Sequence, residues 1–196
     1  MNQKDIAEAD LIIQHENEHK NHRFHPTVYR GTNWDLSHLD PYAFFVDIAE
    51  NKRIAVVIIF TCHCFTHALK NDEREEIPPD ELYETENETR VLNEKRYIFS
   101  KELLLDIVKN LHSRRITVAD AGRNFVTIEQ IDQNGNIVYY GVYFEVSKSK
   151  HRSGRVILRV QSAYQFDNLQ NRQKNAKKVR FSVLIKATYE GRKIKQ

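Results

Sequence analysis

The stretch TCHCFTH, residues 61–67, holds both cysteines of this 196-residue chain and two of its nine histidines. Thiols and imidazoles this close together could ligate zinc, or could act as the nucleophile and base of a cysteine enzyme. They could also end a buried strand, because free cysteine is among the most buried residue types. The alternation of side chains along the preceding residues bears on these three interpretations.

The run RIAVVIIFTC, residues 53–62, has the length and the β-branched composition of a strand. Successive side chains of a strand point to opposite faces. If the strand continues, Cys62 and Cys64 lie on its core-facing row, whereas His63 points the other way. We therefore expect buried, reduced cysteines and no metal cofactor. If a metal were bound, its ligands would be Cys62, Cys64, His67 and His38.

The first 26 residues contain a second histidine-rich segment, HENEHKNHRFH. Its four histidines are His15, His19, His22 and His25. On one helix this spacing would place them on a shared face, where they could bind a transition metal. The surrounding Asn, Glu and Lys residues favour a polar segment without such a site. We interpret residues 1–26 as a polar, His-rich extension and residues 27–196 as a single domain.

The net charge of +3 conceals a division between two parts of the chain. From Ser147 onward there are 14 Lys and Arg but two acids, a net +12, and the first 146 residues have 16 Lys and Arg against 25 acids, a net −9. A basic part of this kind is typical of proteins that bind nucleic acid. The chain has no apolar run that could span a membrane, and it starts without the pattern of a secretory signal. These features predict a cytoplasmic protein.

The order of elements predicts an α+β domain with one main helix on an antiparallel sheet. Residues 43–62 have the pattern of an N-terminal β-hairpin, and the acidic residues 71–96 that of a surface excursion. Residues 100–114 have the apolar spacing of a helix, with Ser100 as its N-cap. About four antiparallel strands follow, and the Asn-Gly pair at residues 134–135 is the signal of a tight turn between the first two.

Alternation in these strands, the last of which is predicted over residues 179–189, gives the sheet a basic open face opposite the helix. This face would carry four cations and two rings: Arg155, Arg159, Arg180, Lys186, Tyr139 and Tyr143. Cations that contact phosphates, interleaved with rings on which bases stack, favour single-stranded RNA as the ligand. The alternative is an ordinary solvated face, on which the same residue types are common.

A helix followed by an antiparallel sheet with a basic face resembles the small ribonucleases of the barnase, EndoU, colicin and RelE-type toxin group. The resemblance covers residues 100–190 and depends on element order. It implies a metal-independent endoribonuclease, a toxin or defence effector, that transfers a phosphodiester to the ribose 2′-hydroxyl. That reaction needs a base, an acid and a cation at the phosphate. His63, with His67 or His38, would transfer the protons, and Lys186 or Arg159 would stabilise the phosphate.

Two other functions fit the same residues. The basic face could bind nucleic acid without cleaving it. Alternatively, the acidic residues 71–96 and the basic C-terminal part could each contact a protein. The expected partners are therefore single-stranded or ribosome-associated RNA, or a protein inhibitor or partner bound through the acidic segment.

Overall fold

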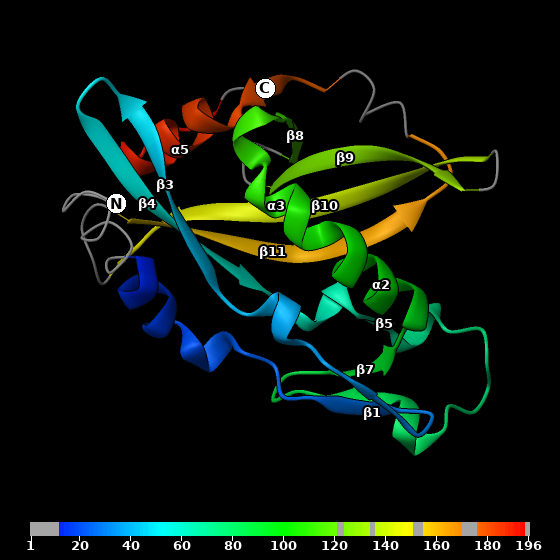
Figure 1. Ribbon diagram of the computed structural model, residues 1–196. Coiled ribbons are helices and arrows are strands. Elements are labelled where there is room, and N and C mark those ends of the chain that lie inside the picture. The colour runs from blue at the N-terminus through cyan, green and yellow to red at the C-terminus, as the bar shows by residue number, and fades with distance from the viewer. Residues whose placement is uncertain (1–11, 121–123, 134–135, 151–154, 170–175, 195–196) are drawn as a thin grey trace.

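The computed structural model describes residues 12–120, 124–133, 136–150, 155–169 and 176–194. Its central element is a seven-stranded sheet, formed by β3 (Tyr42–Ala49), β4 (Lys52–Phe60), β8 (Arg115–Asp120), β9 (Asn124–Gln133), β10 (Asn136–Lys148), β11 (Arg155–Phe166) and β12 (Lys178–Arg180). The strand order is β12-β8-β9-β10-β11-β4-β3 (Figure 1). Neighbouring strands are antiparallel except β4 and β11, which are parallel.

The prediction of an antiparallel sheet of about four strands is wrong. The β3–β4 hairpin forms close to its predicted bounds, but it joins the C-terminal strands through the parallel pairing of β4 with β11. Every residue from Ile54 to Phe60 is buried, as is typical of a strand covered on both faces. Strands β9 and β10 pair as far as Gln133 and Asn136. The predicted turn at residues 134–135 lies outside the described residues.

The two faces of the sheet are covered differently. On one face, apolar side chains of β4, β10 and β11 form the main hydrophobic core with the helices described below. On the opposite face, a small apolar cluster covers only the region of β3 and β4, and it consists of Ala43, Val57 and Ile59 with Ile12 and Ile157 against them. The part of this second face that β8 to β11 form carries polar and aromatic side chains together with Val126 and Ile128, which pair with Tyr143 and Gly141.

The main helix begins earlier than the sequence predicts. It runs without a break through α2 (Glu94–Phe99), the π-helical turn η6 (Ser100–Leu104) and α3 (Leu105–Lys109), and it crosses β10 and β11 (Figure 1). Its N-cap is Asn93, whose Oδ1 accepts the backbone N–H of Arg96 at 2.9 Å. The prediction of Ser100 as N-cap is wrong, because Ser100 is buried within the helix. None of the described helices is both long and apolar enough to cross a membrane.

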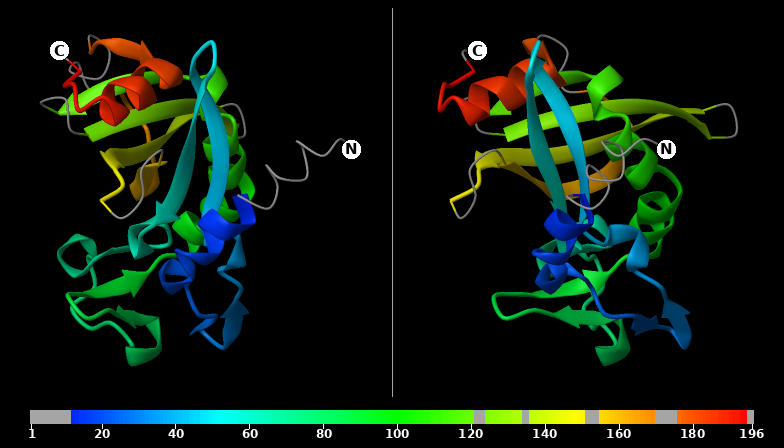
Figure 2. Two further views of the ribbon diagram at one scale, coloured as in Figure 1. Left: turned by 90° about the vertical axis from the view of Figure 1, so that its left-hand side faces the viewer. Right: turned by 60° about the vertical axis from the view of Figure 1, so that its left-hand side comes forward.

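Residues before and after the β3–β4 hairpin form two small sheets (Figure 2). One is the hairpin of β1 (Thr27–Tyr29) and β2 (Thr32–Trp34), and the other holds β5 (Thr66–Ala68), β7 (Thr89–Leu92) and β6 (Leu82–Glu84) in that order. The short 3-10 turns are η1 (Lys20–His22), η2 (Ser37–Leu39), η3 (Cys62–Cys64), η4 (Leu69–Asn71), η5 (Pro79–Glu81) and η7 (Leu111–Ser113).

The acidic residues 71–96 are mostly exposed, but ion pairs to the one buried carboxylate of Glu81 hold them to the small sheets. The side chain of Glu81 is 4% exposed and accepts hydrogen bonds from Nε of Arg30 at 2.8 Å and Nη1 of Arg74 at 2.7 Å. These two bonds lower the pKa of the Glu81 carboxyl below its ordinary value. The segment is therefore fixed to β1 and β2 by charge pairing.

The prediction of a strand over residues 179–189 is also wrong. The chain leaves the sheet after β12 and forms the helix α5 (Phe181–Tyr189), which packs on β3, β10 and β11. Phe181, Leu184 and Ile185 are fully buried, and Val183 is 49% exposed. The apolar residues of this segment fit a period of 3.6 as well as a period of two, so alternation alone could not separate the two structures.

Two single substitutions distinguish the helix from the predicted strand. Leu184→Ala should lower the free energy of unfolding by about 2–5 kcal/mol, because it opens a cavity in the core. Val183→Ala should change it by less than about 0.5 kcal/mol, because that side chain is largely exposed. Urea denaturation followed by circular dichroism measures both. The strand would give the reverse order, since it places Val183 inward and Leu184 outward.

Candidate nucleic-acid interface

Four half-buried aromatic rings lie together on the second face of the sheet. Tyr139 and Tyr143 come from β10, and Tyr164 and Phe166 from β11. Tyr139 is paired directly with Phe166 in the sheet register, and directly paired residues project from the same face. The ring centroids are 5.9 Å apart for Tyr139 and Phe166, 5.2 Å for Tyr143 and Tyr164, and 6.1 Å for Tyr164 and Phe166. We call these four rings the aromatic platform.

The platform does not belong to the interior of the protein. None of its four rings is a member of either hydrophobic cluster among the described residues. At its centre lies Gly141, opposite Tyr164 in the register. A Cβ atom there would lie 2.8 Å from Cε1 of Phe166 and 3.0 Å from Cε2 of Tyr143. Glycine at this position therefore gives the rings the space they occupy over the sheet.

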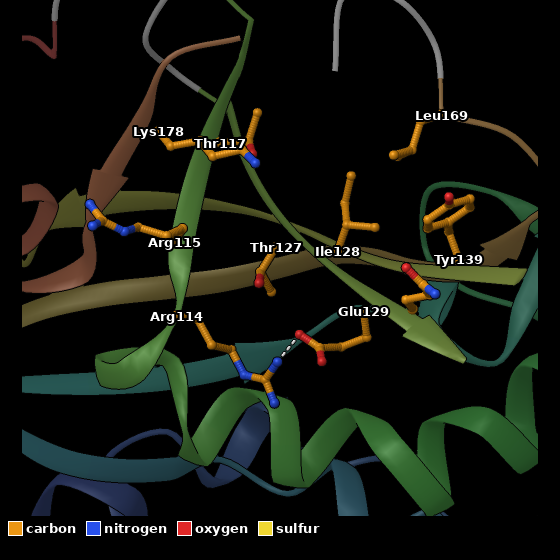
Figure 3. Close-up of a pocket in the computed structure, with 10 residues that line it drawn as sticks. Arg114, Arg115, Thr117, Thr127, Ile128, Glu129, Tyr139, Leu169 and Lys178 are labelled. Carbon is orange, nitrogen blue, oxygen red and sulfur yellow. Dashed lines mark ion pairs between the residues drawn. The ribbon is translucent and has the colours of Figure 1, made fainter. Parts of the chain in front are cut away.

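Cations border the platform on one side, at an opening in the sheet. The pairing of β8 with β9 ends at Thr117 and Val126, and a cavity of about 340 Å³ lies where the two strands separate (Figure 3). Tyr139 lines this cavity together with Arg115 and Lys178, which are exposed and have no ion pair among the described residues.

A third cation that lines this cavity is neutralised. Arg114 forms an ion pair with Glu129 (Figure 3). Burial lowers the pKa of the Arg114 guanidinium. The positive charge that faces solvent at this border therefore comes from Arg115 and Lys178, and from Arg180, which is paired with Arg115 in the sheet.

A further guanidinium lies at the opposite border. Cζ of Arg96, on α2, is 5.0 Å from the centroid of the Tyr164 ring. Lys95 is exposed beside it. Rings on which bases can stack, bordered on two sides by groups that can contact phosphates, are the features that single-stranded nucleic acid requires of a protein surface.

Most of the cations that the sequence predicts for this face are engaged elsewhere. Arg155 is buried, and its Nη1 donates to Glu18 at 2.7 Å. Arg159 forms an ion pair of 3.4 Å with Glu145. Lys186 lies on α5 instead of on a strand. Of the predicted residues, the structure brings together Tyr139 and Tyr143, and it leaves Arg180 near them on the edge strand β12.

Sequence reasoning missed Tyr164 and Phe166. Alternation counted from Val156, Leu158 and Val160 places these rings on the core face. A β-bulge interrupts it, because Tyr143 pairs with Ser162 whereas Phe144 pairs with Val160. The extra residue moves every later side chain of β11 to the other face. The remaining signal in the sequence is that Tyr164 and Phe166 are themselves two residues apart.

The three predicted catalytic histidines are held in separate places. His63 donates through Nε2 to Glu88 at 2.7 Å, His67 to Asp72 at 2.9 Å, and His38 to Ser100 at 2.8 Å. Nδ1 of His67 also accepts a hydrogen bond from Asn93, so both of its ring nitrogens are engaged. Burial lowers the pKa of His38.

Lys186 lies far from these histidines. The hydrogen bond from Arg192 lowers the pKa of Glu190, and the charges of Lys186 and Lys52 add to this shift, so Lys186 is near Lys52 at the start of β4. His63 follows the end of that nine-residue strand. At about 3.3 Å per residue, the two ends of β4 are roughly 30 Å apart. The structure therefore does not assemble His63, His67, His38 and Lys186 into one catalytic site.

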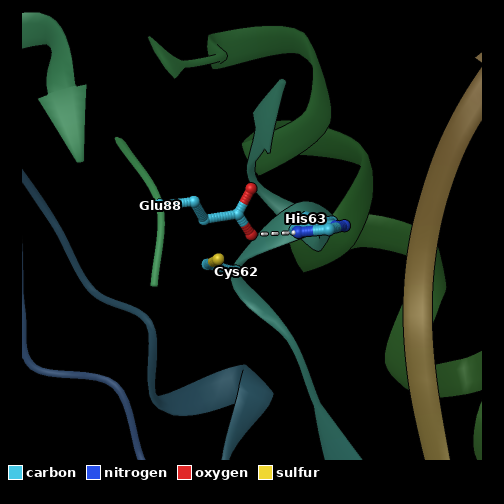
Figure 4. A group of neighbouring side chains, drawn as sticks. All are labelled: Cys62, His63 and Glu88. Atoms are coloured by element: carbon cyan, nitrogen blue, oxygen red, sulfur yellow. Dashed lines mark hydrogen bonds and ion pairs between the residues drawn. The ribbon is translucent and has the colours of Figure 1, made fainter. Parts of the chain in front are cut away.

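One cluster of potential metal ligands is present among the described residues. Ligand atoms of Cys62, His63 and Glu88 all lie within 4.8 Å of one another (Figure 4). The prediction that Cys62 and His63 point apart is wrong, because residues 62–64 form the turn η3 instead of continuing the strand. A thiolate, an imidazole and a carboxylate could hold a zinc ion with one open position. However, the Glu88 carboxylate already pairs with His63, and it accepts a hydrogen bond from Nη1 of Arg90 at 2.8 Å.

The structure does not bring together the four metal ligands expected from the sequence, which are Cys62, Cys64, His67 and His38. Cys64 is fully buried, and His67 and His38 lie in the separate hydrogen bonds described above. The N-terminal histidines do not form a site either, although His15, Glu16 and His19 have the H-E-x-x-H spacing of zinc enzymes. The helix that would present them ends at residue 17. Nη1 of Arg155, a cation, donates to Nδ1 of His15 at 3.2 Å.

Burial protonates both thiols at neutral pH. It raises the pKa of Cys64 to about 12, and it raises that of Cys62 as well. A thiol nucleophile needs the opposite shift, because the thiolate is the reactive form. The prediction that both cysteines are buried is confirmed.

In the Cys62→Ser variant, Cys64 is the one remaining thiol. Its alkylation by iodoacetamide at pH 8 should be at least about 100-fold slower in the folded protein than in 8 M urea, because each unit of raised pKa lowers the thiolate fraction tenfold. Mass spectrometry of timed samples measures the rate. Equal rates in the two states would contradict the burial of this thiol.

The fold and this surface define a protein built on a mixed sheet, with an aromatic face bordered by cations. Residues 26–189 match the model of the YjaZ family, and since this is most of the chain, the protein belongs to the YjaZ family. No curated protein and no solved structure matches the chain.

Proposed function

We propose that the protein binds single-stranded RNA on the aromatic platform. The observation that carries the proposal is the group of four rings around Gly141, which lie outside both hydrophobic clusters of the described chain. Burying rings in a core is favourable, so rings that collect on a sheet face call for another partner. Unpaired bases are such a partner, because each base offers a flat apolar face for stacking.

Charge supports the same ligand. Arg155 and Arg159 are neutralised by acids of the protein. By contrast, Arg115, Lys178 and Arg180 at one border have no ion pair among the described residues. A strand whose bases stack on the rings would place its phosphates next to these cations. The proposal concerns binding. Cleavage stays a prediction of the sequence, and the separated histidines and Lys186 lend it no support.

Substituting the rings should weaken binding of a fluorescein-labelled single-stranded RNA, measured by anisotropy. Tyr143→Ala and Phe166→Ala should each raise Kd about 5- to 150-fold, because each removes stacking of about 1–3 kcal/mol. Tyr143→Phe keeps the ring and should bind within about threefold of the wild type. Gly141→Val should weaken binding by displacing rings, with no change in charge. No binding to RNA or DNA at low salt would sink the proposal and favour a protein partner.

The salt dependence of binding identifies the cations that contact phosphate. In the Arg115→Ala/Lys178→Ala double variant, the slope of log K against log salt should decrease in magnitude by about 1.4, because each cation on a phosphate of a single strand contributes about 0.7 to it. Lys70→Ala and Lys186→Ala are matched controls, since both remove a lysine away from the platform, and they should leave the slope unchanged. An unchanged slope in the double variant would contradict this placement of the RNA.

The same RNA tests for cleavage. After incubation with the protein in EDTA, the RNA should run intact on a denaturing gel, because His63, His67 and His38 are held in separate hydrogen bonds and are not positioned to transfer protons together. Cleavage that disappears in His63→Ala would return the endoribonuclease interpretation to first place.

A further inference from the structure

A second cavity, of about 170 Å³, lies at one end of the aromatic platform between α2 and β11. Tyr164 is one of the four rings of the aromatic platform and also lines this cavity. The residues used below are Lys95, Arg96 and Tyr140, all of which line it. None of the described residues that line it is acidic.

Arg96 brings an uncompensated charge to this cavity. Its Nη1 donates to the backbone oxygens of His63 at 2.9 Å and Thr66 at 2.8 Å. No carboxylate pairs with it among the described residues, and Nε and Nη2 have no partner there. Burial lowers the pKa of its guanidinium. A charge removed from water is costly unless an opposite charge compensates it. Arg96 is only partly buried, and Nε and Nη2 are not among the buried unpartnered atoms of the described chain, so both nitrogens are open and could donate to an anion in the cavity.

Tyr140 adds a second unsatisfied group to the same cavity. Its side chain is fully buried, and its hydroxyl has no hydrogen-bond partner in the described structure. Nearly all buried polar groups of native proteins have a partner, so each exception requires an explanation. A ligand in the cavity would explain this exception, because an anion can accept a hydrogen bond from the phenol hydroxyl of Tyr140.

We propose that this cavity binds a phosphate monoester, namely the terminal phosphate of the RNA strand on the platform. This identification rests on the function proposed above. Arg96 and the exposed Lys95 together offer two positive charges, and a phosphate monoester carries about −1.5 to −2 at neutral pH. An internal phosphodiester carries one charge and has chain on both sides. The cavity therefore fits the end of a strand, whose adjacent bases continue over Tyr164.

Three RNAs of one sequence test the proposal. They carry a 5′-phosphate, a 3′-phosphate or hydroxyls at both ends, and their Kd values are measured by anisotropy. One of the two phosphorylated RNAs should bind about 10- to 100-fold more tightly than the hydroxyl-ended RNA, as expected for charge-assisted hydrogen bonds. Equal affinity of all three would overturn the terminal-phosphate site and leave RNA binding by the platform intact.

Tyr140→Phe removes one oxygen and keeps the ring that packs against Phe99. It should reduce the preference for the phosphorylated end to less than about threefold and leave the Kd of the hydroxyl-ended RNA unchanged. Lys95→Ala, at an exposed position, should also reduce the preference. Tyr189→Phe is the matched control, since it removes a tyrosine hydroxyl from α5, outside both the cavity and the aromatic platform, and it should keep the preference. A preference that survives in Tyr140→Phe would overturn the role of the phenol.

Inorganic phosphate tests the cavity without RNA. Millimolar phosphate should raise the thermal unfolding midpoint of the wild type above that in chloride of equal ionic strength, and it should not do so in Tyr140→Phe. A phosphate effect in a protein that binds no RNA would overturn the terminal-phosphate assignment and refute the proposed function, and would leave a site for free phosphate. In chloride, Tyr140→Phe should unfold at the same temperature as the wild type or higher. A lower midpoint would mean that the hydroxyl is bonded within the protein, and would overturn the proposal.

Discussion

The parallel pairing of β4 with β11 is the constraint on which the rest of the structure depends. It joins the N-terminal hairpin to the C-terminal strands, and it ends where Phe60 lies opposite Val160. Beyond that point β11 continues to Phe166 with β10 on one side and no strand of the described chain on the other. The last residues of β11 thus form an edge of the sheet, and the cavity beside α2 opens there.

The positive charge of the C-terminal part does not form one basic face. Acids from other parts of the chain neutralise individual cations: Glu18 pairs with Arg155, and Glu145 pairs with Arg159. The sum of charges along the sequence cannot reveal such pairs, because the partners come from distant elements or from a neighbouring strand. Five cations without an ion pair among the described residues lie at the borders of the aromatic platform: Arg115, Lys178 and Arg180 at the opening between β8 and β9, and Lys95 and Arg96 beside α2.

The sequence was sufficient where local pattern and tertiary environment agree. The long apolar run of β4, the hairpin formed by β9 and β10, and the shared face of Tyr139 and Tyr143 all follow from a period of two. It was insufficient where two periods fit one segment, as in α5, or where one extra residue changes the register, as at the bulge before Ser162. The apolar spacing predicts the N-cap of the main helix at Ser100, whereas Asn93 caps it in the structure, about two turns earlier in the chain.

The end of β4 also determines what the stretch TCHCFTH can do. The chain turns into η3 after Phe60, so Cys62 and His63 come to one side while Cys64 enters the core. The backbone oxygens of His63, in this turn, and of Thr66 both accept hydrogen bonds from Nη1 of Arg96. These two hydrogen bonds hold the Arg96 guanidinium over the Tyr164 ring. The backbone of this stretch therefore contributes to the platform more directly than its cysteine and histidine side chains, because it positions the guanidinium of Arg96 at one end of the platform.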